Sequence, residues 1–222
     1  MVRLKKLGIN TQMKQIHCKI CGLRTREAVR ACADGGADFI GFVLFEKSSR
    51  NISPEKIPPL LADLEHPKTV AVMVNPTDEY IEAMLEHFTP DYIQLHGDET
   101  PERVREVQKY AKVIKAISVA NKADIERAVA YEGVADMLLF DTKDTKEYGG
   151  TGRAFDWGLI ADFSSDTPWF LSGGLNIDNI NEAIQTTHAK YIDVSSGVEK
   201  TKGVKDIAKI EALLEKTGLT TF

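Results

Sequence analysis

Short apolar runs recur along the chain and alternate with stretches of helical periodicity. The runs start 21 to 32 residues apart and are Ile16–Ile20, Phe39–Leu44, Val70–Val74, Tyr92–Leu95, Val113–Ala116, Met137–Phe140, Trp169–Leu171 and Tyr191–Val194. Their length and their content of β-branched and aromatic residues predict eight buried strands. Strands that alternate with helices at this spacing predict parallel βαβ units.

Most of the intervening segments carry an apolar stripe of helical spacing. The clearest example has apolar residues at i, i+3, i+4 and i+7: Ile81, Met84, Leu85 and Phe88. Thr100 and Pro101 have the residue types of an N-cap and a first helical position. Eight strand–helix units predict closure into an α/β fold of the single-domain (β/α)8 TIM-barrel type, and a doubly wound open sheet is the alternative.

The chain shows no linker or low-complexity segment that would divide it. We therefore expect one catalytic barrel domain over residues 16–222. Residues 1–15 precede the first strand and show no strong periodic signal, so they are interpreted as an N-terminal leader.

Composition narrows the classes of partner. The 222 residues are 43% hydrophobic and carry a net charge of −5, which gives no basic field for non-specific binding of nucleic acid or an anionic membrane. The longest apolar run, residues 39–45, is too short to span a bilayer, and we see no signal-peptide pattern. Three cysteines are too few for a disulfide framework, so a reduced, cytoplasmic compartment is expected.

In a barrel of this type the active site lies at the carboxyl ends of the strands. Strand alternation places several polar residues there on the face that points into the barrel. They are Lys19, Cys21, Gln94, His96, Asp141, Asp193 and Ser195. Polar residues repeated on the inward face are difficult to explain by packing, so we interpret this end as a binding site.

Two glycine-containing loops follow the seventh and eighth strands, where barrels often bind phosphate. Glycine allows backbone N–H groups to approach a phosphate closely. The alternative interpretation is a pair of simple turns. The candidate phosphate-binding residues are Gly173, Gly174, Ser195, Ser196 and Gly197.

Three other features of the predicted mouth allow two interpretations each. Arg50 follows the second strand, where it is either a surface residue or a bidentate partner for a substrate carboxylate. His96 is either a core histidine or a functional one. The segment 142–156 contains Gly149, Gly150 and Gly152, and is either a flexible turn or a lid that closes on substrate.

Cys18 and Cys21 form a C-x-x-C pair, which in other proteins indicates redox chemistry or zinc. Cys18 lies inside a predicted strand, so the two side chains should point to opposite faces. There is no second C-x-x-C to complete a zinc site. We therefore favour separate roles, and Cys32 falls on an apolar helical stripe with Ala28 and Val29.

The motifs at the strand ends, taken in order, resemble phosphoribosylanthranilate isomerase. The resemblance runs from about Ile16 to Glu199 and leaves the leader outside. Cys18 departs from it, because an aliphatic residue is expected there. The motifs are Lys19-Ile20-Cys21-Gly22, Gly41-Phe42-Val43, Ser48-Ser49-Arg50, Gln94-Leu95-His96-Gly97, Leu139-Phe140-Asp141-Thr142, Tyr148-Gly149-Gly150-Thr151-Gly152, Phe155-Asp156-Trp157, Leu171-Ser172-Gly173-Gly174-Leu175 and Asp193-Val194-Ser195-Ser196-Gly197-Val198-Glu199.

The resemblance implies a step of tryptophan synthesis, the Amadori rearrangement of N-(5-phosphoribosyl)anthranilate to 1-(2-carboxyphenylamino)-1-deoxyribulose 5-phosphate. It implies Asp141 as the general acid and Cys21 as the general base, with Lys19 placed to favour the thiolate. No cofactor or metal is expected. The partner is a small phosphoribosyl substrate, and the protein is expected to be a monomer or a homodimer. The residues predicted to bind substrate are Arg50, Gln94, His96 and Asp193.

Two other functions stay open at this point. The related barrel isomerase of histidine synthesis performs the same rearrangement, but it would carry an aspartate at position 21 and two similar halves with two phosphate sites. We see no half-repeat of that kind. The other alternative is a non-catalytic phosphate-binding barrel, which the intact acid and base positions disfavour.

Overall fold

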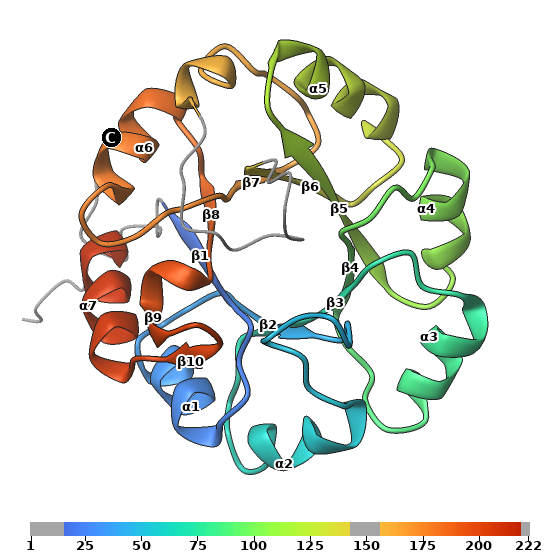
Figure 1. Ribbon diagram of the computed structural model, residues 1–222, viewed down its shortest axis with the longest axis vertical. Helices are drawn as coiled ribbons and strands as arrows, with labels where there is room; N and C mark the ends of the chain where they lie inside the picture. Colours follow the sequence, from blue (N-terminus) through green and yellow to red (C-terminus); the bar gives the residue numbers. More distant parts are fainter. Residues whose placement is uncertain (1–15, 143–155, 219–222) are drawn as a thin grey trace, which may run out of the picture.

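The computed structural model describes residues 16–142 and 156–218, and these form a closed ring of parallel strands surrounded by helices (Figure 1). The first strand, β1, pairs with β2 on one side and with β8 on the other, which closes the barrel. The predicted (β/α)8 barrel is confirmed, and closure excludes the open-sheet alternative. The predicted leader, residues 1–15, and most of the predicted lid, residues 143–155, lie outside the described residues.

All eight predicted runs are strands, with ends that differ by a few residues from the prediction. The strands are β1 (His17–Cys21), β2 (Phe39–Val43), β3 (Lys68–Met73), β4 (Tyr92–Leu95), β5 (Lys112–Val119), β6 (Met137–Thr142), β7 (Trp169–Leu171) and β8 (Tyr191–Val194). The largest difference is in β5, which continues to Val119 because it pairs along its length with β6.

The helices form the outer layer of the barrel. They are α1 (Arg26–Asp34), α2 (Pro58–Leu61), α3 (Asp78–Leu85), α4 (Pro101–Val107), α5 (Lys122–Glu126), α6 (Ile180–Thr187) and α7 (Ile207–Gly218). Thr100 caps α4 as predicted, because its side chain accepts a hydrogen bond from the N–H of Arg103, with Pro101 in the first turn. Thr25 and Thr77 cap α1 and α3 in the same way.

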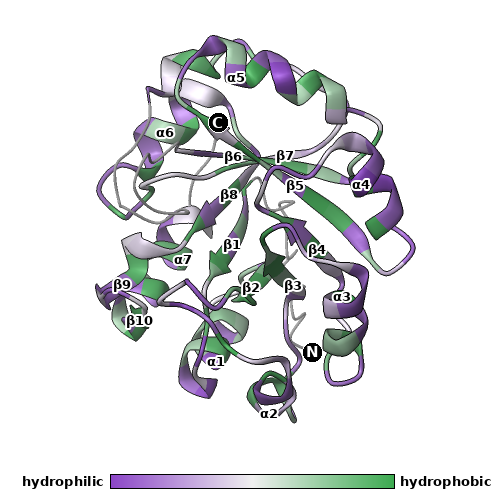
Figure 2. Ribbon diagram, turned by 45° about the vertical axis from the view of Figure 1, so that its right-hand side comes forward, coloured by the Kyte–Doolittle hydropathy of each residue, from purple (hydrophilic) through white to green (hydrophobic). Residues whose placement is uncertain are grey.

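Apolar side chains fill two separate layers. One set lies inside the barrel and includes Cys21, Phe39, Leu139 and Phe170. The larger set packs between the strands and the helices and includes Cys18. Figure 2 shows the consequence: the strands are largely hydrophobic, whereas the helices combine hydrophobic and hydrophilic residues. This double burial explains why the strands appear as short apolar runs in the sequence.

Three aspartates tie neighbouring strands together at the amino end of the barrel. Asp38, Asp91 and Asp136 each stand immediately before a strand and accept a hydrogen bond from the second residue of the preceding strand. The N–H donors are those of Cys18, Thr69 and Val113, at 2.8, 2.7 and 2.8 Å. These hydrogen bonds give the amino end of the barrel a structural role. In barrels of this type the binding site lies at the opposite end.

One feature of the fold was absent from the sequence prediction. After β8 and a 3₁₀ turn at Ser196–Val198, a short hairpin of β9 (Glu199–Thr201) and β10 (Val204–Lys205) precedes α7. Figure 1 shows this hairpin near the mouth, between β8 and the α1–α7 side of the ring.

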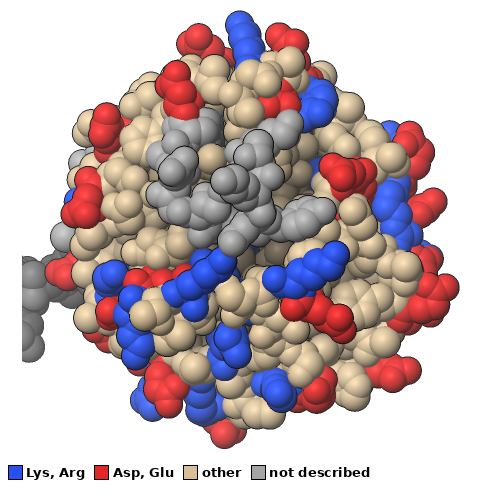
Figure 3. Space-filling model, viewed as in Figure 1, with Lys and Arg blue, Asp and Glu red and all other residues tan. Residues whose placement is uncertain are grey.

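Acidic and basic side chains are interspersed over the face shown in Figure 3. This distribution agrees with the small net charge of −5. Among the described residues, no helix combines the length and apolar character needed to cross a bilayer.

Candidate active site

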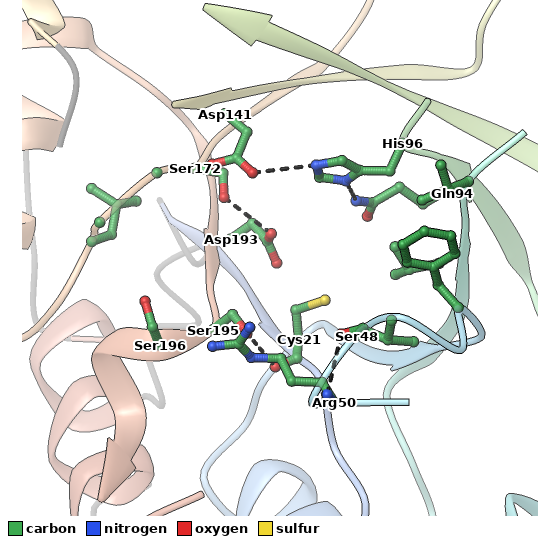
Figure 4. Close-up of a pocket in the computed structure, with 17 residues that line it drawn as sticks. Cys21, Ser48, Arg50, Gln94, His96, Asp141, Ser172, Asp193, Ser195 and Ser196 are labelled. Atoms are coloured by element: carbon green, nitrogen blue, oxygen red, sulfur yellow. Dashed lines mark hydrogen bonds and ion pairs between the residues drawn. The ribbon is translucent and has the colours of Figure 1, made fainter. Parts of the chain in front are cut away.

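A pocket opens at the carboxyl ends of the strands and brings together most of the predicted site residues (Figure 4). Its polar wall comes from six strands or the loops that follow them. These polar lining residues are Cys21, Ser48, Arg50, Gln94, His96, Asp141, Ser172, Asp193, Ser195 and Ser196. The inward parity predicted for the strand ends is therefore confirmed for Cys21, Gln94, Asp141 and Asp193.

The apolar part of the lining, called here the apolar wall, comes mainly from β2, β3 and the residues that follow them, with one residue from the loop after β7. It consists of Val43, Phe45, Val72, Val74 and Leu175. None of these residues was predicted to line the site, although Val72 and Val74 lie two apart in the third run and so share the inward face. A pocket with one apolar wall and several convergent polar groups suits a small molecule that carries a ring and charged substituents.

Cys21 lies at the end of β1, and its sulfur points into the pocket (Figure 4). Gly41 is its partner in β2, and a Cβ added at Gly41 would stand 2.9 Å from the Cys21 sulfur. The missing side chain at Gly41 therefore leaves the room that the thiol occupies. Cys18 is fully buried in the outer layer, so the two sulfurs face opposite sides as predicted.

A buried ion pair lies beneath the thiol. Lys19 Nζ stands 2.9 Å from Asp193 Oδ1, and Asp193 Oδ2 accepts a 3.2 Å hydrogen bond from Ser172. Burial opposes the charge of Lys19, but the facing Asp193 and Cys21 raise its pKa above the ordinary value. Asp193 therefore lines the pocket as predicted while serving first as the partner of Lys19.

The thiol of Cys21 is protonated more readily than an ordinary cysteine. Burial raises its pKa, and the nearby charges of Lys19 and Lys205 reduce this shift without reversing it. The expectation that Lys19 favours the thiolate is therefore correct in sign but incomplete, because burial is the larger effect.

Asp141, His96 and Gln94 form a chain of contacts across the pocket. His96 Nε2 lies 3.3 Å from Asp141 Oδ2, and Gln94 Nε2 lies 2.8 Å from His96 Nδ1 (Figure 4). With the Gln94 amide donating to Nδ1, the neutral ring carries its hydrogen on Nε2, the nitrogen that lies nearer to Asp141. Gln94 Oε1 is buried without a hydrogen-bond partner among the described residues.

Arg50 is held by a carboxylate of the protein itself. Its Nε and Nη2 atoms donate to Glu199 Oε1 and Oε2 at 2.7 and 2.9 Å. Lys205 Nζ lies 3.0 Å from Glu199 Oε1 and also donates to the carbonyl of Ser195 at 2.8 Å. Neither Lys205 nor a role for Glu199 was predicted, because the hairpin that carries them has no recognisable strand pattern in the sequence.

The two glycine loops occupy the place predicted for phosphate binding. Gly173 and Gly174 have φ values of +87° and +70°, a conformation that favours glycine, and both line the pocket beside Ser195 and Ser196. Gly197 does not line this pocket. It lies in a neighbouring depression that shares Gly174 and Ser196 with the pocket, and a side chain at Gly197 would collide with the carbonyl of Leu175.

The described residues offer no cluster of three or more histidine, cysteine or acidic side chains arranged to hold a metal ion. The groups of this pocket that can donate or accept a proton include the thiol of Cys21, the carboxyl of Asp141 and the imidazole of His96. A closed barrel with such a pocket at the carboxyl ends of its strands defines a (β/α)8-barrel enzyme of small-molecule metabolism.

Comparisons with known proteins extend this conclusion. The family model described as N-(5'-phosphoribosyl)anthranilate (PRA) isomerase matches residues 18–216. The chain belongs to this family. It is 48% identical over 204 residues to the N-(5'-phosphoribosyl)anthranilate isomerase of Caulobacter vibrioides. The aligned residues cover 89% of this chain and 93% of that relative.

Solved structures agree with the family assignment. The phosphoribosyl anthranilate isomerase of Thermotoga maritima superposes with a TM-score of 0.82 at 36% identity, covering 91% of this chain and 98% of that one. A further isomerase structure, in complex with reduced 1-(o-carboxyphenylamino)-1-deoxyribulose 5-phosphate, superposes with a TM-score of 0.79 at 35% identity over the same shares.

Proposed function

We propose that this pocket isomerises N-(5'-phosphoribosyl)anthranilate, with Asp141 as general acid and Cys21 as general base. The observation that carries the proposal is the placement of the two groups in one pocket, on β6 and β1, between an apolar wall and two glycine loops. Asp141 protonates the ribose ring oxygen, and the ring opens to a Schiff base. Cys21 then removes the C2′ proton, and the resulting enolamine tautomerises to the ketone. One proton is added and one removed, so the reaction needs no external electron acceptor.

His96 assists the acid step in this proposal. Its Nε2 lies 3.3 Å from Asp141 Oδ2, and Gln94 favours the tautomer with hydrogen on Nε2 by donating to Nδ1. Once Asp141 has given its proton to the ring oxygen, this N–H stabilises the new carboxylate. A donor aimed at the charge that develops lowers the barrier to proton transfer.

The base step depends on a thiolate that is scarce but strongly basic. Burial raises the pKa of Cys21, which reduces the thiolate fraction at neutral pH and makes each thiolate a better proton acceptor. The Lys19 ammonium, itself held by Asp193 at 2.9 Å, supplies the positive charge that offsets part of the cost of burying the anion.

The remaining walls of the pocket suit the two ends of the substrate. The phosphate is assigned to Gly173, Gly174, Ser195 and Ser196, with Gly197 supporting the loop from behind. The anthranilate ring is assigned to the apolar wall. Its carboxylate is assigned to Arg50, which retains Nη1 and a second Nη2 hydrogen after pairing with Glu199.

The test is a fluorescence assay in which anthranilate, phosphoribosyl pyrophosphate and the preceding transferase generate the unstable substrate in place. We expect consumption of the substrate to accelerate in proportion to added protein. Turnover of the histidine-pathway substrate instead would favour the related barrel isomerase, and binding of product analogue without turnover would indicate a non-catalytic barrel.

The partner implied by this function is a phosphoribosyl small molecule rather than nucleic acid or a membrane. The oligomeric state, monomer or homodimer, and the cytoplasmic location stay predictions. Light scattering coupled to size exclusion would decide the first, and fractionation of cells that produce the protein would decide the second.

A further inference from the structure

A further buried ion pair lies outside the pocket. Lys115 Nζ on β5 stands 2.8 Å from Glu99 Oε2, and each side chain is only 2% exposed. Lys115 points away from the barrel interior, because its neighbours Ile114 and Ala116 occupy the interior layer. Burying two charges costs desolvation that their attraction often fails to recover, so a pair like this is weak evidence for a purely stabilising role.

Lys115 contacts the backbone on both sides of His96. Its ammonium donates to the carbonyl of Gly97 at 2.7 Å and to the carbonyl of Leu95 at 3.4 Å. These are the residues immediately before and after His96. The lysine therefore fixes, from behind the strand, the peptide segment that carries the imidazole.

Glu99 holds the same peptide segment from the loop side, and we refer to Glu99 and Lys115 together as the bracket. Its carboxylate accepts hydrogen bonds from the N–H of Gly97, at 3.1 and 3.0 Å, and from the N–H of Asn75, at 2.8 Å. Asn75 belongs to the loop after β3. One buried carboxylate thus joins two neighbouring loops at the mouth and holds the lysine that fixes His96.

We propose that Glu99 and Lys115 are positioning residues that hold His96 at the distance from which it acts on Asp141. The proposal rests on the proposed function, because it concerns the acid step. Among the described residues, the His96 ring contacts Gln94 and Asp141 inside the pocket (Figure 4). Its backbone is held by its own N–H, which donates to the carbonyl of Met73 at 2.8 Å, and by Lys115 and Glu99, which hold the peptide groups on either side. A displacement of about 1 Å in such a constellation costs up to about a hundredfold in rate.

The test is the double variant Glu99→Gln/Lys115→Met. It removes both charges together, which avoids leaving one charge buried alone, and the glutamine still accepts from the loop N–H groups. Only the donors to the two carbonyls around His96 are lost. We expect kcat to fall about 10- to 100-fold with KM nearly unchanged.

A second background separates positioning from general damage. In a His96→Gln protein the same double change should cause little further loss of kcat, because the group that the bracket positions is already gone. If the double change lowers kcat by the same factor in the parent and in His96→Gln, the proposal is overturned. A folded double variant with the kcat of the parent would overturn it as well.

Glu99→Asp provides a milder variant if the double variant does not fold. It keeps the charge but is one methylene too short to contact Lys115 and both N–H donors together, so the same loss and the same non-additivity with His96→Gln are expected. Parental kcat in folded Glu99→Asp would equally refute the bracket.

The His96 ring resonances, followed by NMR, give a readout that needs no turnover. They should move in either variant, while those of His17, at the amino end of β1, stay in place. Inactivity of the parent protein would reject the proposed function alone, whereas unmoved His96 resonances would reject this inference alone.

Discussion

The Arg50 guanidinium and the Glu199 carboxylate form a two-point ion pair, with N–O distances of 2.7 and 2.9 Å and both side chains buried. Burial opposes the charge of Glu199, but the hydrogen bond from Arg50 and the charge of Lys205 lower its pKa below the ordinary value. The pair links the loop after β2 to the β9–β10 hairpin. The pair fixes the orientation of the Arg50 guanidinium, and the edge that Glu199 does not contact faces the pocket.

Replacing Arg50 by alanine is expected to raise KM about 10- to 100-fold and to leave kcat close to that of the parent. A charge-assisted hydrogen bond to the substrate carboxylate contributes about 1.5–3 kcal/mol, and it is made equally in the ground and transition states. Steady-state kinetics on the isomerase assay measure both constants. Arg50→Ala/Glu199→Gln serves as the control that also removes the carboxylate charge which Arg50→Ala leaves facing Lys205. A defect confined to kcat would contradict the assignment.

Asp141→Asn is expected to lose about 10²–10⁴ in kcat, which is the usual contribution of a positioned acid. Substrate affinity should change little, because the amide has the same shape and still accepts from His96. The matched control is Asp98→Asn, an exposed position in the loop after β4. Turnover of Asp141→Asn at the rate of the control would remove Asp141 from the acid role.

The barrel and the parity of its strand ends were predictable, because both depend on local periodicity. Burial on two faces makes each strand a short apolar run, and alternation then assigns Cys21, Gln94, Asp141 and Asp193 to the pocket. Figure 4 shows these side chains around one pocket.

The long-range ion pairs were not predictable in this way. Glu199 lies 149 residues from Arg50, and the strands that carry Glu199 and Lys205 are only three and two residues long. Lys115 interrupts an apolar run, but nothing local indicates that Glu99 is its partner. A lysine inside a buried strand was the available signal, since such a charge must be paired.

The buried thiol of Cys32 is expected to make the free energy of unfolding depend on pH. Burial raises its pKa from 9.0 to about 12. At pH values below the ordinary pKa, the thiol is protonated in both the folded and the unfolded state and does not change the free energy of unfolding. Above it the unfolded chain loses the proton while the folded protein retains it, so the free energy of unfolding falls as pH rises, by about 1 kcal/mol per pH unit until the folded value is reached.

The difference in the free energy of unfolding between Cys32→Ala and the parent should therefore become smaller at alkaline pH. At neutral pH we expect it to be about 1 kcal/mol less stable than the parent, because a buried side chain is truncated. Near pH 10 the difference should shrink or reverse. Urea unfolding at the two pH values measures this, with Val29→Ala on the same face of α1 as the control. Identical behaviour of the two variants across pH would show that Cys32 does not titrate as stated.

The two cysteines of the C-x-x-C pair should respond differently to substitution. Cys21→Ser is expected to lose about 10²–10⁴ in kcat, because a hydroxyl forms the anion far less readily than a thiol. Cys18 is fully buried in the outer layer, so Cys18→Val should keep most activity and change stability by about 1 kcal/mol. Equal large losses at both positions under reducing conditions would support a redox pair instead.

The pH profile identifies the base among the groups around it. Burial raises the pKa of Cys21, so the thiolate fraction and with it kcat/KM should rise with pH across the neutral range, by up to about tenfold per pH unit. Lys19→Met removes a charge that lowers this pKa, so the rise should move to higher pH, and alkylation of Cys21 by iodoacetamide should slow at a given pH. A profile that is flat in the parent, or unmoved by Lys19→Met, would show that a group other than Cys21 accepts the C2′ proton.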